Sequence, residues 1–139
     1  MNAPLYTLDI LRLAASLPEP AEIARIDGSA SKRSPTCGST VATQVQLEEG
    51  RVTAISQRVS ACAFGQASAA LVSKHAAGRS RAEVQTALDQ LRGWLSGERD
   101  VPPDWPGYDA LSPARSRTGR HGAILLPLRA FLAVIEAAG

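Results

Sequence analysis

The chain has 139 residues, of which 45% are hydrophobic and only 4% aromatic, so we expect one domain spanning residues 1–139 with an aliphatic core. Its formal net charge of +2 and its few aromatic side chains argue against a nucleic-acid-binding protein. No run of apolar residues reaches the roughly 18 that a membrane span needs, so we expect no membrane partner.

The first half of the chain is predicted to form one helix and a three-stranded antiparallel meander. An apolar stripe at helical spacing covers residues 5–17 and ends at Pro18. A polar stretch, residues 29–35, separates the first predicted strand from the second, and the glycine-bearing loop at residues 48–50 joins the second to the third. Alternating side chains predict these three strands at residues 21–26, 40–47 and 51–61.

Two helices are predicted directly after the meander. The first, starting at about Phe64, is built almost wholly of small residues, and we expect it to end at Gly78. The second opens with a capping box between Ser80 and Glu83 and ends before Gly97.

The last part of the chain combines an insertion with a final helix. Residues 97–119 are rich in proline, glycine and serine, and we expect Trp105 and Tyr108 to pin them to the body of the protein. Residues 121–138 are nearly all apolar, which predicts a helix that is buried or covered by a partner, with Pro127 at the first turn of its main segment. Together the elements predict an α+β fold, a three-stranded antiparallel sheet packed on one face by helices.

The two cysteines, Cys37 and Cys62, flank the predicted hairpin. Its arms are similar in length, so we expect both thiols at the same end of the sheet. Cys62 also falls where a strand gives way to a helix, and a helix N-terminus favours a thiolate. The residues alone leave open two unrelated cysteines, a disulfide, or a shared metal or sulfur site. Two cysteines and no secretory leader favour a reducing, cytoplasmic location, which argues against the disulfide.

Three blocks of the sequence resemble the NifU/IscU-type iron–sulfur cluster assembly scaffolds, in their SufU-like branch. Residues 35–38, PTCG, match the first cysteine turn of the family. Residues 62–72, CAFGQASAALV, followed by GRS at 78–80, match its second cysteine block and are the most specific part. Residues 120–127, RHGAILLP, match its third block in frame, and the insertion fits the SufU-like branch. The resemblance covers essentially the whole chain and implies the same α+β fold.

The chain departs from the family pattern at two ligand positions. Ser39 stands where the family has an aspartate, and Gly122 stands where it has a third cysteine. The resemblance therefore carries over only Cys37 and Cys62 as metal ligands. His121, beside the missing cysteine, is either a third, imidazole ligand or an ordinary surface histidine. The residues expected near this site are Gly38, Ser39, Arg120 and Gly122.

The resemblance implies a scaffold-like protein of iron–sulfur cluster assembly that transiently binds iron and sulfide or persulfide through two cysteines. Its cargo would be a [2Fe–2S] cluster, and its partners a cysteine desulfurase and a downstream iron–sulfur acceptor protein. Two alternatives stay open: a zinc-binding sulfur acceptor for a desulfurase, and a degenerate member that binds partners but no metal. We expect no enzyme, since the chain lacks a nucleophile elbow and a phosphate-binding loop.

The charges are unevenly distributed along the chain. Acidic residues are absent from residues 50–82 and from residues 110–135, although both stretches carry several arginines. This distribution fits either a solvated surface or a basic docking face for an acidic partner.

Overall fold

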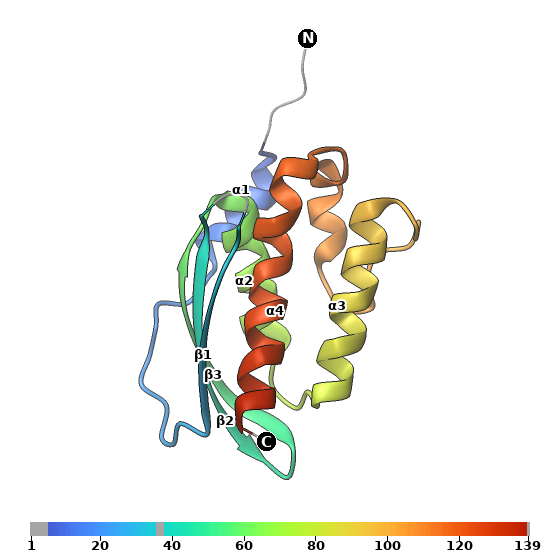
Figure 1. Ribbon diagram of the computed structural model, residues 1–139. Coiled ribbons are helices and arrows are strands. Elements are labelled where there is room, and N and C mark those ends of the chain that lie inside the picture. The colour runs from blue at the N-terminus through green and yellow to red at the C-terminus, as the bar shows by residue number, and fades with distance from the viewer. Residues whose placement is uncertain (1–5, 36–37, 139) are drawn as a thin grey trace.

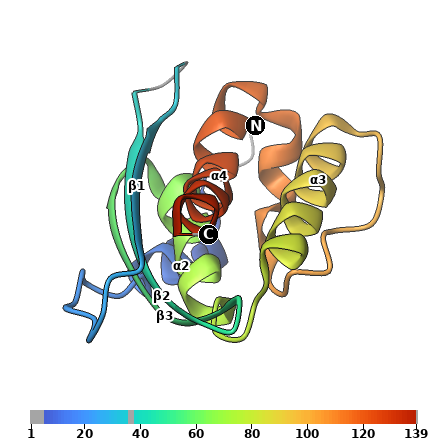
Figure 2. The same cartoon turned by 60° about the horizontal axis from the view of Figure 1, so that its bottom comes forward.

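The computed structural model describes residues 6–35 and 38–138. The elements, in chain order, are α1 (Leu8–Ala15), β1 (Gly28–Arg33), β2 (Thr40–Glu48), β3 (Arg51–Ser60), α2 (Ala63–His75), α3 (Arg81–Ser96), the 3-10 helices η1 (Tyr108–Ser116) and η2 (Thr118–Arg120), and α4 (His121–Ala138). The strands form one antiparallel sheet, and the helices pack against one face of it (Figure 1). Helices α2 and α4 lie on the sheet, and α3 lies on the far side of α4 (Figure 2). The predicted α+β architecture is therefore confirmed.

The hairpin of β2 and β3 supplies most of the buried side chains of the sheet. Its register places Val41 opposite Val59 on the inner face, and Val41 and Val45 are completely buried. The tight turn between the strands uses Glu49 and Gly50, both with positive φ (53° and 76°), a conformation that glycine adopts without steric cost. The predicted hairpin and its loop are confirmed.

The first strand was predicted in the wrong place. Residues 21–26 form no strand in the structure, and two of their backbone N–H groups bond to side chains of the sheet instead of to a neighbouring strand. The N–H group of Ala21 donates to Ser56 Oγ, and that of Arg25 donates to Gln46 Oε1, each at 3.1 Å. The segment therefore crosses the outer face of the sheet and does not extend its edge.

The polar stretch that follows forms β1 instead. Gly28 begins this strand and approaches α4 so closely that a Cβ atom there would lie 2.5 Å from the carbonyl oxygen of Val134. Only a glycine permits that approach. The remaining side chains are mostly polar and exposed, as suits an edge strand that contacts α4 on one side only. Alternation of apolar residues could not reveal a strand of this composition.

The predicted helix boundaries hold closely for α3 and less closely for α1. Helix α3 has the capping box, in which Ser80 Oγ accepts the N–H of Glu83 at 3.3 Å and Glu83 Oε1 accepts the N–H of Ser80 at 3.2 Å. Gly97, at φ 86°, ends the helix in the left-handed conformation. Helix α1 is shorter than the predicted residues 5–17, since Thr7 caps its start, and residues 1–5 lie outside the described part of the chain.

The insertion is attached to the helices by its aromatic side chains, as predicted. Trp105 and Tyr108 are both buried, and Trp105 Nε1 donates to the carbonyl oxygen of Leu71 at 2.9 Å. Most of the second half of the insertion is wound into η1 and η2, which the proline and glycine content did not predict.

Helix α4 is the central helix of the protein. Pro127 lies in its interior, not at its first turn as predicted, because the helix already begins at His121. By length and composition, Thr118–Ala138 could cross a membrane, but most of this segment is buried between the sheet and the other helices. Its apolar character is thus explained by its place in the core.

A buried chain of hydrogen bonds ties three of these elements together. Ser68 Oγ in α2 donates to the carbonyl oxygen of Ile124 in α4 at 2.6 Å. Since Ser68 has only one hydroxyl proton, Tyr108 of η1 is the donor of the 2.8 Å bond that joins its hydroxyl to Ser68 Oγ. Burial raises the pKa of Tyr108 well above its ordinary value, so the phenol stays protonated.

We predict that Ser68→Ala lowers the free energy of unfolding by about 2 kcal/mol, because it leaves the buried Tyr108 hydroxyl without a partner and removes a hydrogen bond to the carbonyl oxygen of Ile124. Tyr108→Phe should cost less, since the bond from Ser68 to Ile124 survives. Urea unfolding measures both changes. Ser112→Ala, which removes an exposed hydroxyl, is the control. If Ser68→Ala costs no more than Ser112→Ala, the hydrogen-bond chain is not a determinant of stability.

Candidate functional site

Cys62 lies at the junction of β3 and α2, as the sequence predicted. It is the N-cap residue of α2, with extended backbone (φ −67°, ψ 173°), and its side chain makes no capping hydrogen bond. The carbonyl oxygen of Cys62 accepts the N–H of Gln66 at 2.9 Å, and Gln66 Nε2 donates to the carbonyl oxygen of Ala61 at 2.9 Å. These two bonds fix the backbone around a half-buried thiol that is left free to react or to bind.

The turn that carries the other predicted ligand meets the sheet at the same end. Cys37 itself lies outside the described residues. On either side of it, the N–H of Ser34 donates to the carbonyl oxygen of Ser39 at 2.8 Å, and the N–H of Gly38 donates to that of Ser34 at 3.2 Å. Thr40, the next residue, pairs with Arg33 on one side and with Ser60 on the other, as the register shows, and Cys62 follows two residues later.

His121, the third predicted ligand, is held in one orientation by the insertion. Its Nε2 atom lies 2.9 Å from the carbonyl oxygen of Ala114 and 3.1 Å from that of Arg115. Carbonyl oxygens only accept hydrogen bonds, so Nε2 carries the proton. The lone pair of the neutral ring is then on Nδ1, which has no hydrogen-bond partner among the described residues. Histidine ligands of metals are commonly oriented by such a bond from the other ring nitrogen to a carbonyl group.

A close approach of α2 and α4 brings the two helix starts together. Gly65, one turn after Cys62, is buried, and a Cβ atom there would lie 3.3 Å from the carbonyl oxygen of Ala123 and 2.7 Å from the Cβ of Ala61. Ala123 follows His121 by two residues. The small side chains of α2 therefore set the spacing between the start of α2 and the start of α4.

The donor groups of this region suit a soft or borderline metal ion. Cys62 offers a thiolate and His121 an imidazole nitrogen, both of which bind zinc and iron. Within residues 6–35 and 38–138, no three histidine, cysteine, aspartate or glutamate side chains cluster closely enough to hold a metal ion. A complete site would therefore need a ligand from outside these residues, where the predicted ligand Cys37 lies. Of the other residues predicted near the site, Ser39 is buried, Arg120 and Gly122 are half-buried, and Gly38 is exposed at φ 72°.

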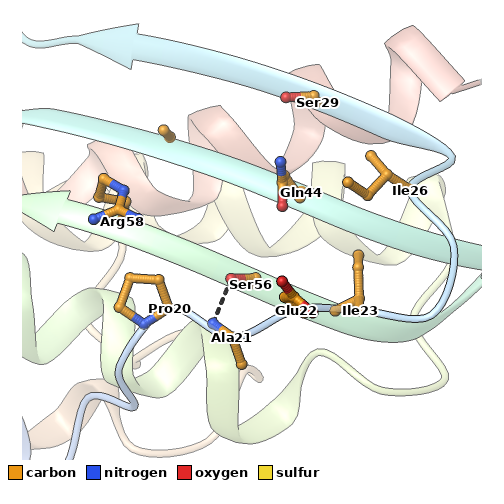
Figure 3. A pocket seen from close by; sticks show the side chains of 10 residues that line it. Pro20, Ala21, Glu22, Ile23, Ile26, Ser29, Gln44, Ser56 and Arg58 are labelled. Atoms are coloured by element: carbon orange, nitrogen blue, oxygen red, sulfur yellow. Dashed lines mark hydrogen bonds between the residues drawn. The ribbon is translucent and has the colours of Figure 1, made fainter.

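A hollow of about 530 Å³ lies on the outer face of the sheet, away from the predicted ligands. Figure 3 shows that the segment crossing this face, from Pro20 to Ile26, forms one wall and the strands form the other. Its lining is largely aliphatic and neutral, apart from Glu22 and Arg58. Of the predicted site residues that the structure describes, none lines it.

Two supporting features of the site were not predicted from the sequence. One is the pair of carbonyl groups, at Ala114 and Arg115, that orients His121. The other is the bond from Gln66 that fixes the peptide before Cys62. Neither feature can be predicted from residue types, because every residue has a backbone carbonyl group. Which of these groups accepts a hydrogen bond from a given side chain depends on the folded structure.

Comparison with solved structures finds close similarity over nearly the whole chain. The N-terminal part of a nitrogen-fixing NifU-like protein from Brucella abortus matches with a TM-score of 0.89 and 28% identity, over 96% of this chain and 94% of that one. A putative iron–sulfur cluster assembly scaffold protein for the SUF system from Fervidobacterium islandicum matches with a TM-score of 0.76 and 14% identity, over 94% of this chain and 96% of that one. No family model and no curated protein matches the sequence.

We predict that neutral His121 is the Nε2–H tautomer, because both of its acceptors are carbonyl oxygens. Long-range proton–nitrogen correlation spectra of 15N-labelled protein identify the tautomer directly. Finding the proton on Nδ1 would show that the ring is turned the other way and would contradict ligation through Nδ1.

We predict that Gly65→Ala destabilises the protein by about 1–3 kcal/mol, since the new methyl group forces α2 away from Ala123. Gly93→Ala is the matched control, because a Cβ there meets only the Cβ of Arg99 at 3.6 Å. That exchange in α3 should stabilise the protein by up to about 1 kcal/mol. Thermal unfolding measures both. Equal effects of the two exchanges would contradict the close packing of α2 against α4.

Proposed function

Given that the chain has the fold and the sequence blocks of the NifU/IscU/SufU-type iron–sulfur cluster assembly scaffolds, we propose that it carries iron and sulfur transiently on Cys37 and Cys62. His121 supplies a third ligand through Nδ1. The cargo is a labile [2Fe–2S] cluster, taken up as iron and sulfide or persulfide and passed on to an acceptor protein.

The observation that carries this proposal is the position of Cys62. Its thiol is half-buried at the N-terminus of α2, and it makes no capping hydrogen bond. The described flanks of Cys37 and the first residue of α4 lie at the same end of the sheet. A thiolate, an oriented imidazole and the second cysteine together make a donor set that iron and zinc both accept.

The donor set is smaller than that of the family pattern, and we propose that this makes the cargo easier to release. A closed zinc or iron–sulfur site uses four protein ligands. Here Gly122 and Ser39 supply no ligand at the positions of the third cysteine and the aspartate. At least one coordination position is therefore left for water or for a group of the partner.

We further propose that the protein works as a carrier without turnover of its own, in the cytoplasm. Its partners are a cysteine desulfurase, which supplies sulfur, and an iron–sulfur acceptor protein. The similarity to a SUF-system scaffold supports this assignment of partners.

Anaerobic reconstitution with Fe²⁺ and sulfide, followed by metal analysis and visible absorption spectra, tests the proposal. We predict coloured protein with bound iron, and loss of most of that iron in Cys37→Ser and in Cys62→Ser. Gly122→Cys should raise metal affinity by at least about tenfold, since even outer-shell changes shift it by about 10–100-fold. Ser112→Cys, an exposed thiol in η1, is the control and should change nothing.

The outcome also separates the alternative functions. Stoichiometric zinc without colour would identify a sulfur acceptor that holds zinc. Absence of both metals from the protein, with no gain in Gly122→Cys, would contradict a metal carrier and leave a partner-binding protein of the same fold.

A further inference from the structure

A groove of about 380 Å³ crosses α4 between the edge strand β1 and helix α3. Its floor is aliphatic, and its rim carries positive charges from all three elements. We call it the basic groove. The floor is formed by Leu88, Leu126, Leu132 and Ala133, and the cations are Lys32, Arg33, Arg92 and Arg129.

None of the four cations has a hydrogen bond or ion pair with the described residues. The one carboxylate among the described residues that line the groove belongs to Glu136, and it forms an ion pair with Arg81 outside the groove, with Nη2 3.2 Å from Oε1. This differs from the arginines elsewhere, many of which are held by carboxylate or carbonyl oxygens: Arg25, Arg51, Arg79, Arg81, Arg99 and Arg115. The groove thus concentrates positive charge that the protein itself does not neutralise.

Arg129 is the most constrained of the four. Its side chain is half-buried in the middle of the groove, and its Nε–H group is completely buried without an acceptor. Burial and the nearby charge of Arg92 lower the pKa of Arg129. Two neighbouring cations, one of them half-buried, cost free energy by repulsion, and a bound anion would offset that cost.

The groove leads to the predicted ligands. Arg33 ends β1, and its Nη2 atom lies 3.8 Å from where a Cβ of Gly38 would be, beside the turn that flanks Cys37. A molecule lying in the groove therefore ends next to that turn.

We propose that the basic groove docks an acidic segment of a partner protein, in which carboxylates alternate with aliphatic side chains. The carboxylates meet the four cations, and the aliphatic side chains cover the floor, as in protein interfaces with an apolar centre and a charged rim. A nucleic acid fits less well, because the groove offers no aromatic side chain on which bases could stack.

This inference rests on the proposed function for the identity of the partner. On that proposal, the partner is a protein that delivers sulfur to the cysteines at the end of the groove or takes the cluster from them. The existence of the docking groove itself does not depend on the metal.

Fluorescence anisotropy of a labelled synthetic peptide of alternating glutamate and leucine tests the groove. The wild-type protein should bind it, more weakly as salt is raised. Lys32→Glu combined with Arg92→Glu should weaken binding about tenfold or more, since each exposed pair is worth up to about 1 kcal/mol and is turned repulsive. The matched control is Arg58→Glu combined with Arg117→Glu, which changes the net charge equally at exposed sites outside the groove.

Other outcomes of these binding experiments would contradict the proposed docking groove. No binding of the peptide, or equal loss in both double variants, would overturn the docking groove. Tighter binding of single-stranded DNA or of phosphatidylglycerol vesicles, lost in the groove variant, would overturn it in favour of those ligands, and displacement of the peptide by inorganic phosphate would reduce it to a small-anion site.

The same proteins separate this inference from the proposed function. The groove variant should keep reconstituted metal, whereas Cys37→Ser and Cys62→Ser should keep the peptide. A wild-type protein that binds the peptide but no metal would contradict the proposed function, and one that binds metal but not the peptide would contradict the groove.

Discussion

The close contact between α2 and α4 is the constraint on which the rest of the structure depends. Gly65 lets the backbone of α4 approach, and Ser68 bridges to the carbonyl oxygen of Ile124 one turn further along. The buried hydroxyl of Tyr108 completes this chain, so the insertion is fixed to the same pair of helices. Small side chains and one shared hydrogen-bond chain thus hold two helices and the insertion in a single register.

This register gives the site its geometry. Because α2 and α4 are held near their starts, Cys62 at the beginning of one and His121 at the beginning of the other come to one end of the sheet. The insertion then orients the imidazole, because the carbonyl oxygen of Ala114 accepts a hydrogen bond from the Nε2–H group of His121. Packing between α2, α4 and the insertion therefore decides where the side chains of Cys62 and His121 lie at this end of the sheet.

The sequence predicted those features that have a local cause. The capping box at Ser80, the hairpin turn at Gly50 and the strand-to-helix junction at Cys62 each follow from residues close together in the chain. The first strand could not be found this way, because β1 is polar and its place depends on the approach of Gly28 to α4. The orientation of His121 could not be predicted from the sequence either, since backbone carbonyl groups in another segment determine it.

X-ray absorption at the zinc edge of the zinc-loaded protein tests most directly whether the cysteines and His121 share one site. The account predicts two sulfur ligands at about 2.3 Å and one imidazole nitrogen at about 2.0–2.1 Å, with oxygen in the remaining position. A first shell of oxygen and nitrogen atoms only, or a single sulfur ligand, would contradict it.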